Sequence, residues 1–259
     1  MDMKTVSIII PHHNSSTLLK RLIKSIPSSL DAEIIVVDDN SNITEFDTIK
    51  TYSQLYNFKL YKNEGKTAGG ARNTGLKYAN GKWIIFADAD DIFTDILEKS
   101  ITPYFTSDYD IIFFNVNSII SESGEKAYRD RHIKYILSKY QSTKNENYLR
   151  CMYLAPWGKM YKKDFITYNS IKYEERSAGN DMWFAVRSGV EANKIHIDYN
   201  EIYTCTVSKG SITTTLSKDR FEDKLQATIR TNTYLRRKKL SNYQVSVLYF
   251  IAKAKQFGW

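Results

Sequence analysis

Apolar runs alternate with segments of helix length along the first 115 residues. The runs lie at 6–10, 33–37, 58–61, 83–87 and 110–114. Between them, apolar residues at helical spacing predict helices over 18–23, about 44–56 and 71–79. Buried strands that alternate with helices are typical of βαβ units. The pattern therefore predicts an α/β fold with a Rossmann-like, mainly parallel sheet and helices on both faces.

The pattern is less regular after residue 115. Residues 121–148 are polar and rich in charge, which predicts loops or an exposed antiparallel excursion. A helix is predicted over 179–190, followed later by a helical C-terminal tail. One face of the tail holds Tyr243, Val247, Phe250, Ile251 and Ala254. We expect a first subdomain over 1–115, a second over 116–215 and a basic helical region over 216–259.

The positive charge of the chain is concentrated in that last region. Residues 216–259 carry ten Lys and Arg against three acids, so they supply +7 of the net +8. Basic residues 236–239 beside an apolar helix face are typical of a helix that lies on an anionic membrane. The same pattern fits a helix that docks on the protein's own body. Nucleic acid is a further candidate, but the basic tail is all that favours it, and we expect no nucleic-acid partner.

Two cysteines, Cys151 and Cys205, are too few for a disulfide framework or a zinc site and fit a reducing compartment. The N-terminal apolar run is too short for a signal peptide, and no apolar stretch approaches the roughly 18 residues that a membrane span needs. We therefore expect a cytoplasmic protein, either free or held peripherally on the inner face of the cell membrane.

Three carboxylates follow the apolar run at 83–87. Asp88 and Asp90, two positions apart, lie on the same side of an extended backbone, and Asp91 follows. Open α/β sheets bind ligands at the carboxyl ends of their strands. Carboxylate oxygens suit Mg²⁺ or Mn²⁺, which commonly hold the phosphates of a substrate. A strand-end turn before a capped helix would explain the same residues.

Six segments, taken in order, resemble the inverting glycosyltransferases of family 2, which have the GT-A fold. They are VSIIIPHHN at 6–14, VVDDNS at 36–41, GARNTGL at 70–76, FADADD at 86–91, WGKMY at 157–161 and GNDMWF at 179–184. The match covers roughly residues 4–215 and is most similar to bacterial enzymes that build capsule or other surface polysaccharides. It implies transfer from a UDP-sugar donor to a hydroxyl of a saccharide acceptor or a lipid-linked oligosaccharide, assisted by Mn²⁺ or Mg²⁺.

The resemblance also implies which residues bind the donor. They are Pro11, His13, Asn14, Asp39, Lys66, Arg72, Asp88 and Lys209. The loop that holds His13 would contact the uracil, and Asp39 would accept a hydrogen bond from the uracil ring N–H. Asp90 would ligate the metal, with Asp88 at the ribose or the metal's waters. Asp39 also fits a helix N-cap, His13 fits an ordinary loop histidine, and Arg72 also fits a structural pair with Asp88 or Asp90.

Asp181 matches the general base of the family. Inversion requires the acceptor hydroxyl to lose its proton as it attacks opposite the leaving group, and a carboxylate can accept that proton. The family usually has Glu before this base, whereas this chain has Asn180. Trp157, Lys159 and Asn180 are the implied acceptor contacts. A first-turn helix acid would also explain Asp181, and a core position would also explain Trp157.

Two other functions remain open from the sequence. A nucleotidyltransferase also uses metal-binding acids on an α/β sheet, but it normally has a glycine-rich phosphate loop after the first strand, and residues 11–17 contain no glycine. A non-catalytic nucleotide-sugar-binding protein would bind the donor without any need for Asp181.

Overall fold

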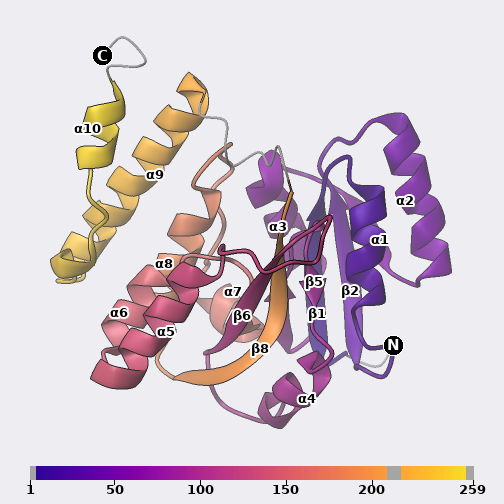
Figure 1. The fold of residues 1–259 in the computed structure, drawn as a ribbon, viewed down its shortest axis with the longest axis horizontal. Helices are drawn as coiled ribbons and strands as arrows, with labels where there is room; N and C mark the ends of the chain where they lie inside the picture. Colours follow the sequence, from indigo (N-terminus) through magenta and orange to yellow (C-terminus); the bar gives the residue numbers. More distant parts are fainter. Residues whose placement is uncertain (1–3, 209–216, 255–259) are drawn as a thin grey trace.

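The computed structural model describes residues 4–208 and 217–254, and in these residues the strands form one eight-stranded sheet (Figure 1). The strand order is β3-β2-β1-β4-β7-β6-β8-β5. The strands are β1 Val6–His12, β2 Ala32–Asp38, β3 Lys59–Lys62, β4 Trp83–Phe86, β5 Ile92–Phe93, β6 Ile111–Ile120, β7 Lys159–Lys162 and β8 Ile195–Val207. The α/β fold with a C-terminal helical region is confirmed.

The sheet is parallel in its first half and mixed in its second. β1 pairs in parallel with β2 and β4, and β2 pairs in parallel with β3. β7 runs antiparallel between β4 and β6, whereas β8 is parallel to β6 and antiparallel to β5. The apolar runs predict the buried strands because strands covered on both faces read as continuous apolar segments. Their direction in the second half does not follow from that pattern.

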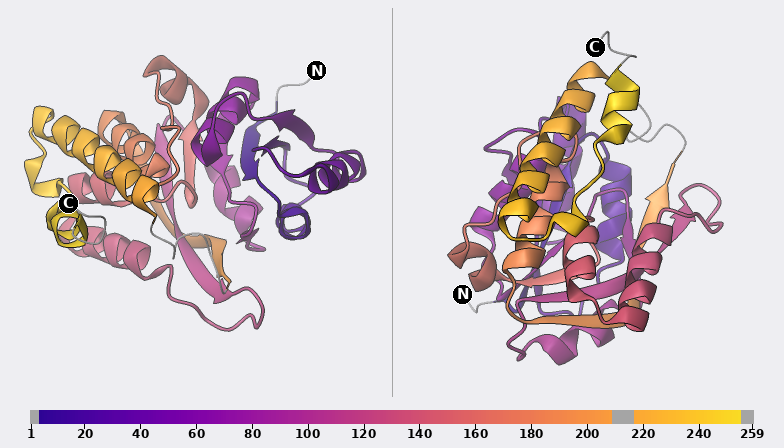
Figure 2. Two further views of the ribbon diagram at one scale, coloured as in Figure 1. Left: turned by 90° about the horizontal axis from the view of Figure 1, so that it is seen from above. Right: turned by 90° about the vertical axis from the view of Figure 1, so that its left-hand side faces the viewer.

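Helices cover both faces of the sheet (Figures 1 and 2). They are α1 Ser16–Lys24, α2 Ile43–Leu55, α3 Thr67–Tyr78, α4 Leu97–Ile101, α5 Arg131–Thr143, α6 Glu146–Met152, α7 Lys163–Tyr168, α8 Asn180–Glu191, α9 Lys218–Arg237 and α10 Leu248–Ala254. The chain moves from β1 to β2 to β3 in one direction along the sheet and returns to β4. Right-handed crossovers therefore put α1 and α2 on one face and α3 on the other.

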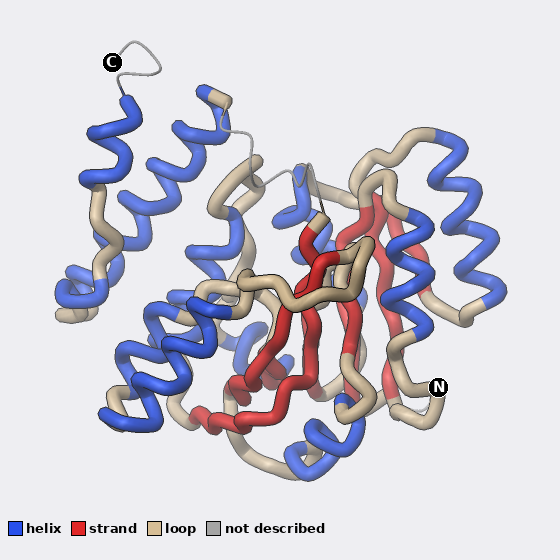
Figure 3. The backbone as a smooth tube through the Cα atoms, in the orientation of Figure 1, coloured by secondary structure: helices blue, strands red, loops and turns tan. Residues whose placement is uncertain are grey.

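The predicted loops over 121–148 are wrong for most of that stretch. Residues 121–130 form a loop that leads from β6, but α5 and α6 follow it (Figure 3). Ile133, Ile136 and Leu137 are the buried residues of α5, and their spacing is helical. Because charged and polar residues surround these three positions, the segment reads as polar on average.

The C-terminal region contains two helices rather than one continuous face. After α9, a turn at Ser241–Tyr243 precedes α10. The hydroxyl of Tyr243 donates to Asn145, and the ring of Phe250 is buried against Phe221. Ile251 by contrast is 64% exposed. The predicted face is therefore divided between residues that pack on the protein and residues that face solvent. None of the helices in the described part of the chain has the length and apolar character that crossing a membrane requires.

Candidate active site

The acid cluster lies where β4 ends, at the carboxyl edge of the parallel strands. Carboxylate oxygens of Asp88, Asp90 and Asp91 all lie within 4.8 Å of one another. Asp91 is buried, and its oxygens accept hydrogen bonds from the Tyr203 hydroxyl at 2.8 Å and the Thr206 backbone N–H at 2.7 Å. Both partners come from β8, so this carboxylate ties the cluster to the second half of the sheet.

Asp88 and Asp90 are only partly buried, and their carboxylates fit a divalent cation. Burial raises the pKa of Asp90, and the charge of Asp88 raises it further. Both effects penalise the charged carboxylate, and a bound cation would offset them. Hard oxygen ligands are what Mn²⁺ and Mg²⁺ prefer. We therefore retain Asp88 and Asp90 as the residues that would hold the metal, with Asp91 behind them.

Arg72 joins the acid cluster to Asp181. Its guanidinium is buried beneath the site and donates to Asp88 Oδ1 at 2.6 Å and to Asp181 Oδ1 at 2.8 Å. The guanidinium also lies 5.3 Å from the ring centre of Tyr173. The pair with Asp88 is one of the two interpretations that the sequence left open. The bond to Asp181, across 109 residues of chain, was not predicted.

Asp181 is in the first turn of α8, and its side chain is 36% exposed. Partial burial raises its pKa, while Arg72 opposes that shift. Gly179 precedes the helix with φ of +73°, a left-handed conformation that glycine adopts without strain. The amide of neighbouring Asn180 donates to the Arg176 carbonyl at 3.2 Å. The start of α8 thus lies near the acid cluster, because Asp181 and Asp88 both bind Arg72.

A cleft of about 270 Å³ brings Asp88 and Asp181 together with Trp157 and Arg129. Trp157 lines this cleft, although most of its ring is buried and stacks on Tyr203 with centroids 5.5 Å apart. The core interpretation therefore holds for most of the side chain, and the contact with an acceptor stays a prediction. The sequence analysis missed Arg129, because residue 129 lies in a polar segment that carries no motif.

Lys159 lies in the core and not in the cleft. Its side chain is 1% exposed, and its amine donates to the Tyr153 carbonyl at 2.6 Å among aromatic rings. Burial lowers the pKa of Lys159 to about 7. The position of this amine gives no support to the predicted direct contact with an acceptor. Lys159 follows Trp157 and Gly158 at the start of a buried strand, where sequence pattern does not tell a surface lysine from a buried one.

The residues predicted for the nucleotide base lie at the ends of β1 and β2. The exposed His13 ring is 2.8 Å from the Asp39 carbonyl through Nδ1, and Asn14 adopts a left-handed φ of +46°. Asp39 Oδ1 accepts from the Asn63 amide at 2.7 Å. His12, at the end of β1, is buried and pairs instead with Asp38 at 3.1 Å. The sequence did not distinguish the roles of the two adjacent histidines.

The remaining predicted donor residues have different surroundings. Pro11 lies within β1 and is partly buried, and Lys66 is exposed at the position before α3. The backbone N–H of Lys66 donates to Glu175 at 3.0 Å. Lys209 lies outside the described residues.

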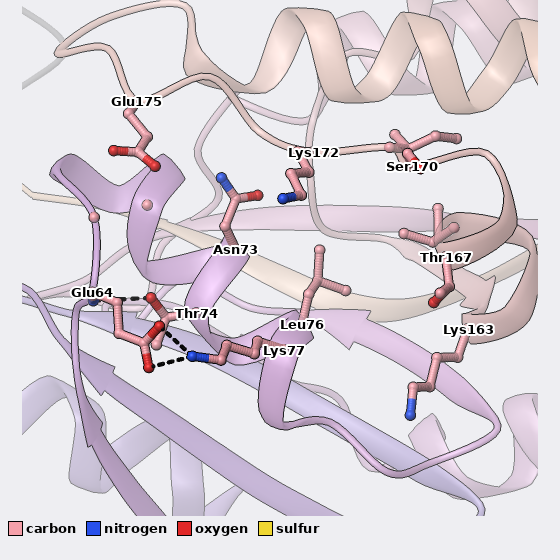
Figure 4. A pocket seen from close by; sticks show the side chains of 14 residues that line it. Glu64, Asn73, Thr74, Leu76, Lys77, Lys163, Thr167, Ser170, Lys172 and Glu175 are labelled. Atoms are coloured by element: carbon pink, nitrogen blue, oxygen red, sulfur yellow. Dashed lines mark hydrogen bonds and ion pairs between the residues drawn. The ribbon is translucent and has the colours of Figure 1, made fainter.

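A larger pocket, of about 510 Å³, lies between α3 and α7 (Figure 4). Glu64 and Lys77 form an ion pair at its wall. Within the described chain, its lining includes none of the predicted site residues. Asp88, Trp157 and Asp181 line the smaller cleft instead.

Comparison with known proteins gives the same family as the sequence motifs. A family model described as glycosyl transferase family 2 matches residues 7–168. The putative glycosyltransferase EpsH of Bacillus subtilis (strain 168) is 24% identical over 237 residues, which are 87% of this chain and 67% of that protein. The glucosyltransferase WfgD of Escherichia coli is 35% identical over 133 residues, covering 47% of this chain and 51% of that one.

The fold also resembles a solved structure. The crystal structure of S. aureus TarS 1-349 in complex with UDP-GlcNAc superposes with a TM-score of 0.70 at 20% identity, covering 89% of this chain and 66% of that one. This likeness confirms the GT-A fold. The chain thus spans between 51% and 67% of the length of these three relatives. Because the family model matches more than half of the sequence, this chain belongs to glycosyl transferase family 2.

Proposed function

We propose that this protein is an inverting glycosyltransferase that moves a sugar from a UDP-sugar to a hydroxyl of a saccharide acceptor. The observation that carries the proposal is the arrangement around the cleft. Carboxylates from two distant elements, Asp88 at the end of β4 and Asp181 at the start of α8, face one cleft and share Arg72. Asp88 belongs to the acid cluster that is suited to a metal, and Asp181 lies outside that cluster.

We assign donor binding to residues 1–115. His13 and Asp39 at the strand ends would receive the uracil, since an exposed imidazole can stack on a base and a carboxylate can accept from the ring N–H. Asp88 and Asp90 would hold Mn²⁺ or Mg²⁺, and the bound cation supplies charge that stabilises the departing nucleoside diphosphate. UDP as the nucleotide is supported by WfgD, which is named as using UDP-Glc, and by TarS, which was solved with UDP-GlcNAc.

We assign the general base to Asp181. Arg72 occupies Oδ1, so the acceptor proton would pass to Oδ2. The raised pKa of this carboxyl makes it a better proton acceptor than an exposed aspartate, and the first turn of α8 holds it at the cleft. Trp157, which lines the cleft, would contact the acceptor sugar, and Asn180 is next to the base in the chain.

We infer a lipid-linked oligosaccharide in surface-polysaccharide synthesis as the acceptor. WfgD is named for transfer to GlcNAc-diphosphoundecaprenol, a lipid-linked acceptor. An acceptor of this kind would place the enzyme at the inner face of the membrane. The exposed residues Leu248 and Ile251 of α10, at 71% and 64% exposure, support such a contact. Lys253 lies in the same short helix, and the amine of Lys224 lies 5.5 Å from the ring centre of Tyr249 in that helix. The basic residues 236–239 lie at the far end of α9, where Lys238 pairs with Glu191.

The test is release of UDP from a panel of UDP-sugars in the presence of Mn²⁺, with wild type and Asp181→Asn compared. The wild type should release UDP with at least one donor. The variant should bind UDP normally and lose about 10²- to 10⁴-fold in transfer to a true acceptor, which is the usual contribution of a general base. A wild type that binds UDP but turns over no donor would identify a non-catalytic binding protein. Near-normal transfer by Asp181→Asn would mean that the base lies elsewhere.

A further inference from the structure

Arg129 contributes a guanidinium to the active-site cleft. It lines the cleft with Asp88 and Asp181. Among the residues that the structure describes, its guanidinium has no hydrogen bond and no ion pair. Arg72, the other arginine at this site, donates from both of its terminal nitrogens to Asp88 and Asp181. An incoming anion would therefore meet Arg129 as the available guanidinium.

Several hydrogen bonds hold the backbone at Arg129 in place. Ser118 is buried on β6, and its hydroxyl oxygen accepts a hydrogen bond from the backbone N–H of Arg129 at 3.0 Å. Its carbonyl accepts a second hydrogen bond from the backbone N–H of Ala127 at 2.9 Å. The same hydroxyl donates to the buried carboxylate of Asp130 at 3.0 Å. Lys134 pairs with that carboxylate at 2.7 Å. The loop thus presents its arginine from a fixed point, which lowers the entropy cost of binding a ligand.

The electrostatic surroundings of Arg129 connect it to the acid cluster. Loss of surrounding water lowers the pKa of Arg129, but the charges of Asp91 and Asp88 raise it, and the net shift is upward. The guanidinium therefore lies close enough to the cluster to respond to its charge, but the side chains of the cluster do not bind it directly. A ligand that reaches both a cation held by Asp88 and Asp90 and the guanidinium must carry several anionic oxygens.

We propose that Arg129 binds the diphosphate of the nucleotide-sugar donor, in the cleft that it lines together with Asp88. The inference rests on the proposed function, because it takes a nucleoside diphosphate sugar as the donor. The planar fork of a guanidinium matches phosphate oxygens in pairs, and such charge-assisted bonds are strong and specific. As the bond to the sugar breaks, negative charge grows on the diphosphate, and the charge of Arg129 would stabilise it.

Calorimetry of UDP and uridine in the presence of Mn²⁺ tests the proposal on the full chain. Arg129→Gln should bind UDP about 10- to 100-fold more weakly, because hydrogen bonds to charged groups are worth about 1.5–3 kcal/mol. Its affinity for uridine, which has no phosphate, should equal that of the wild type. Arg131→Gln is the matched control, because Arg131 is an exposed arginine two positions away that stacks on Tyr128 and does not line the cleft.

The outcomes separate this inference from the proposed function. If the wild type binds UDP and Arg129→Gln binds it equally well, the inference is wrong and the proposed function stands. If Arg129→Gln loses UDP and uridine to the same degree, the arginine does not act on the phosphates, and the inference is again wrong. A folded wild type that binds neither UDP nor any UDP-sugar would instead remove the proposed function. Thermal unfolding of each variant confirms that the compared proteins are folded.

Discussion

Replacing Arg72 by Met should destabilise the protein through the two carboxylates that it leaves behind. The arginine side chain is 5% exposed, whereas those of Asp88 and Asp181 are 23% and 36% exposed. Breaking a fully buried ion pair costs about 3–5 kcal/mol. Water reaches both carboxylates here, so we expect a smaller loss of about 2–3 kcal/mol in the free energy of unfolding at pH 7. This is a large part of the 5–15 kcal/mol that typical domains have.

A double-mutant cycle measured by urea unfolding isolates the bond between Arg72 and Asp181. Arg72→Met, Asp181→Asn and the double variant should give a coupling energy of roughly 1–3 kcal/mol, as for residues in direct contact. Arg187→Met combined with Asp181→Asn is the control. Arg187 lies in the same helix as Asp181, but among the described residues its guanidinium donates hydrogen bonds only to the carbonyls of residues 169 and 170. The two control substitutions should be additive. A coupling below about 0.5 kcal/mol for Arg72 and Asp181 would refute the claim that the arginine holds this carboxylate.

Three further outcomes follow from other parts of the structure. Asp90→Asn should abolish the Mn²⁺ dependence of UDP binding in calorimetry with the fold intact, and equal metal-dependent affinity in both proteins would contradict the metal assignment. Burial raises the pKa of Glu33, but bonds including that from Lys59 lower it overall, so its stabilising charge is present above about pH 4.3 and is lost as the pH falls through its folded pKa. Glu33→Gln should therefore lower the free energy of unfolding by about 1–3 kcal/mol at pH 7. Thermal unfolding should find a smaller difference from the wild type at pH 3.5. No difference at pH 7 would show that the carboxylate is dispensable. Replacing Leu248 and Ile251 by Glu should reduce sedimentation with anionic vesicles relative to wild type, and a wild type that fails to sediment with them at low salt would remove the membrane proposal.

The sequence predicts the first half of the fold well for a physical reason. Buried parallel strands such as β1 and β4 are apolar throughout, so they appear directly as apolar runs. The sequence does not predict helix α5, because its buried residues occupy three positions and charged or polar residues surround them. β8 is partly exposed along its first half, and its mixed pattern gives no such run. Averages over a segment therefore hide elements that bury only a narrow stripe.

The candidate site can also be predicted only in part from the sequence. Motifs at strand ends can be predicted to meet, because parallel strands end at one edge of a sheet. The bridge from Arg72 to Asp181, the place of Arg129 in the cleft and the burial of Lys159 cannot be predicted in this way. Each depends on which rotamer a long side chain adopts among residues that are far apart in the chain. The sequence thus indicates the reacting groups more readily than the contacts that hold them.

Tyr203 limits how this enzyme can be recombined with its relatives. Its hydroxyl accepts the backbone N–H of Asp88 at 2.9 Å and donates to Asp91, while its ring stacks on Trp157. One side chain from β8 therefore sets the position of the acid loop of the first half and of the aromatic wall of the second. A chimera joined at residue 115 would take the acid loop from one parent and the residue at position 203 from the other. Recombination with a related gene, in the laboratory or in nature, should succeed where β4, the acid loop and β8 all come from the same parent.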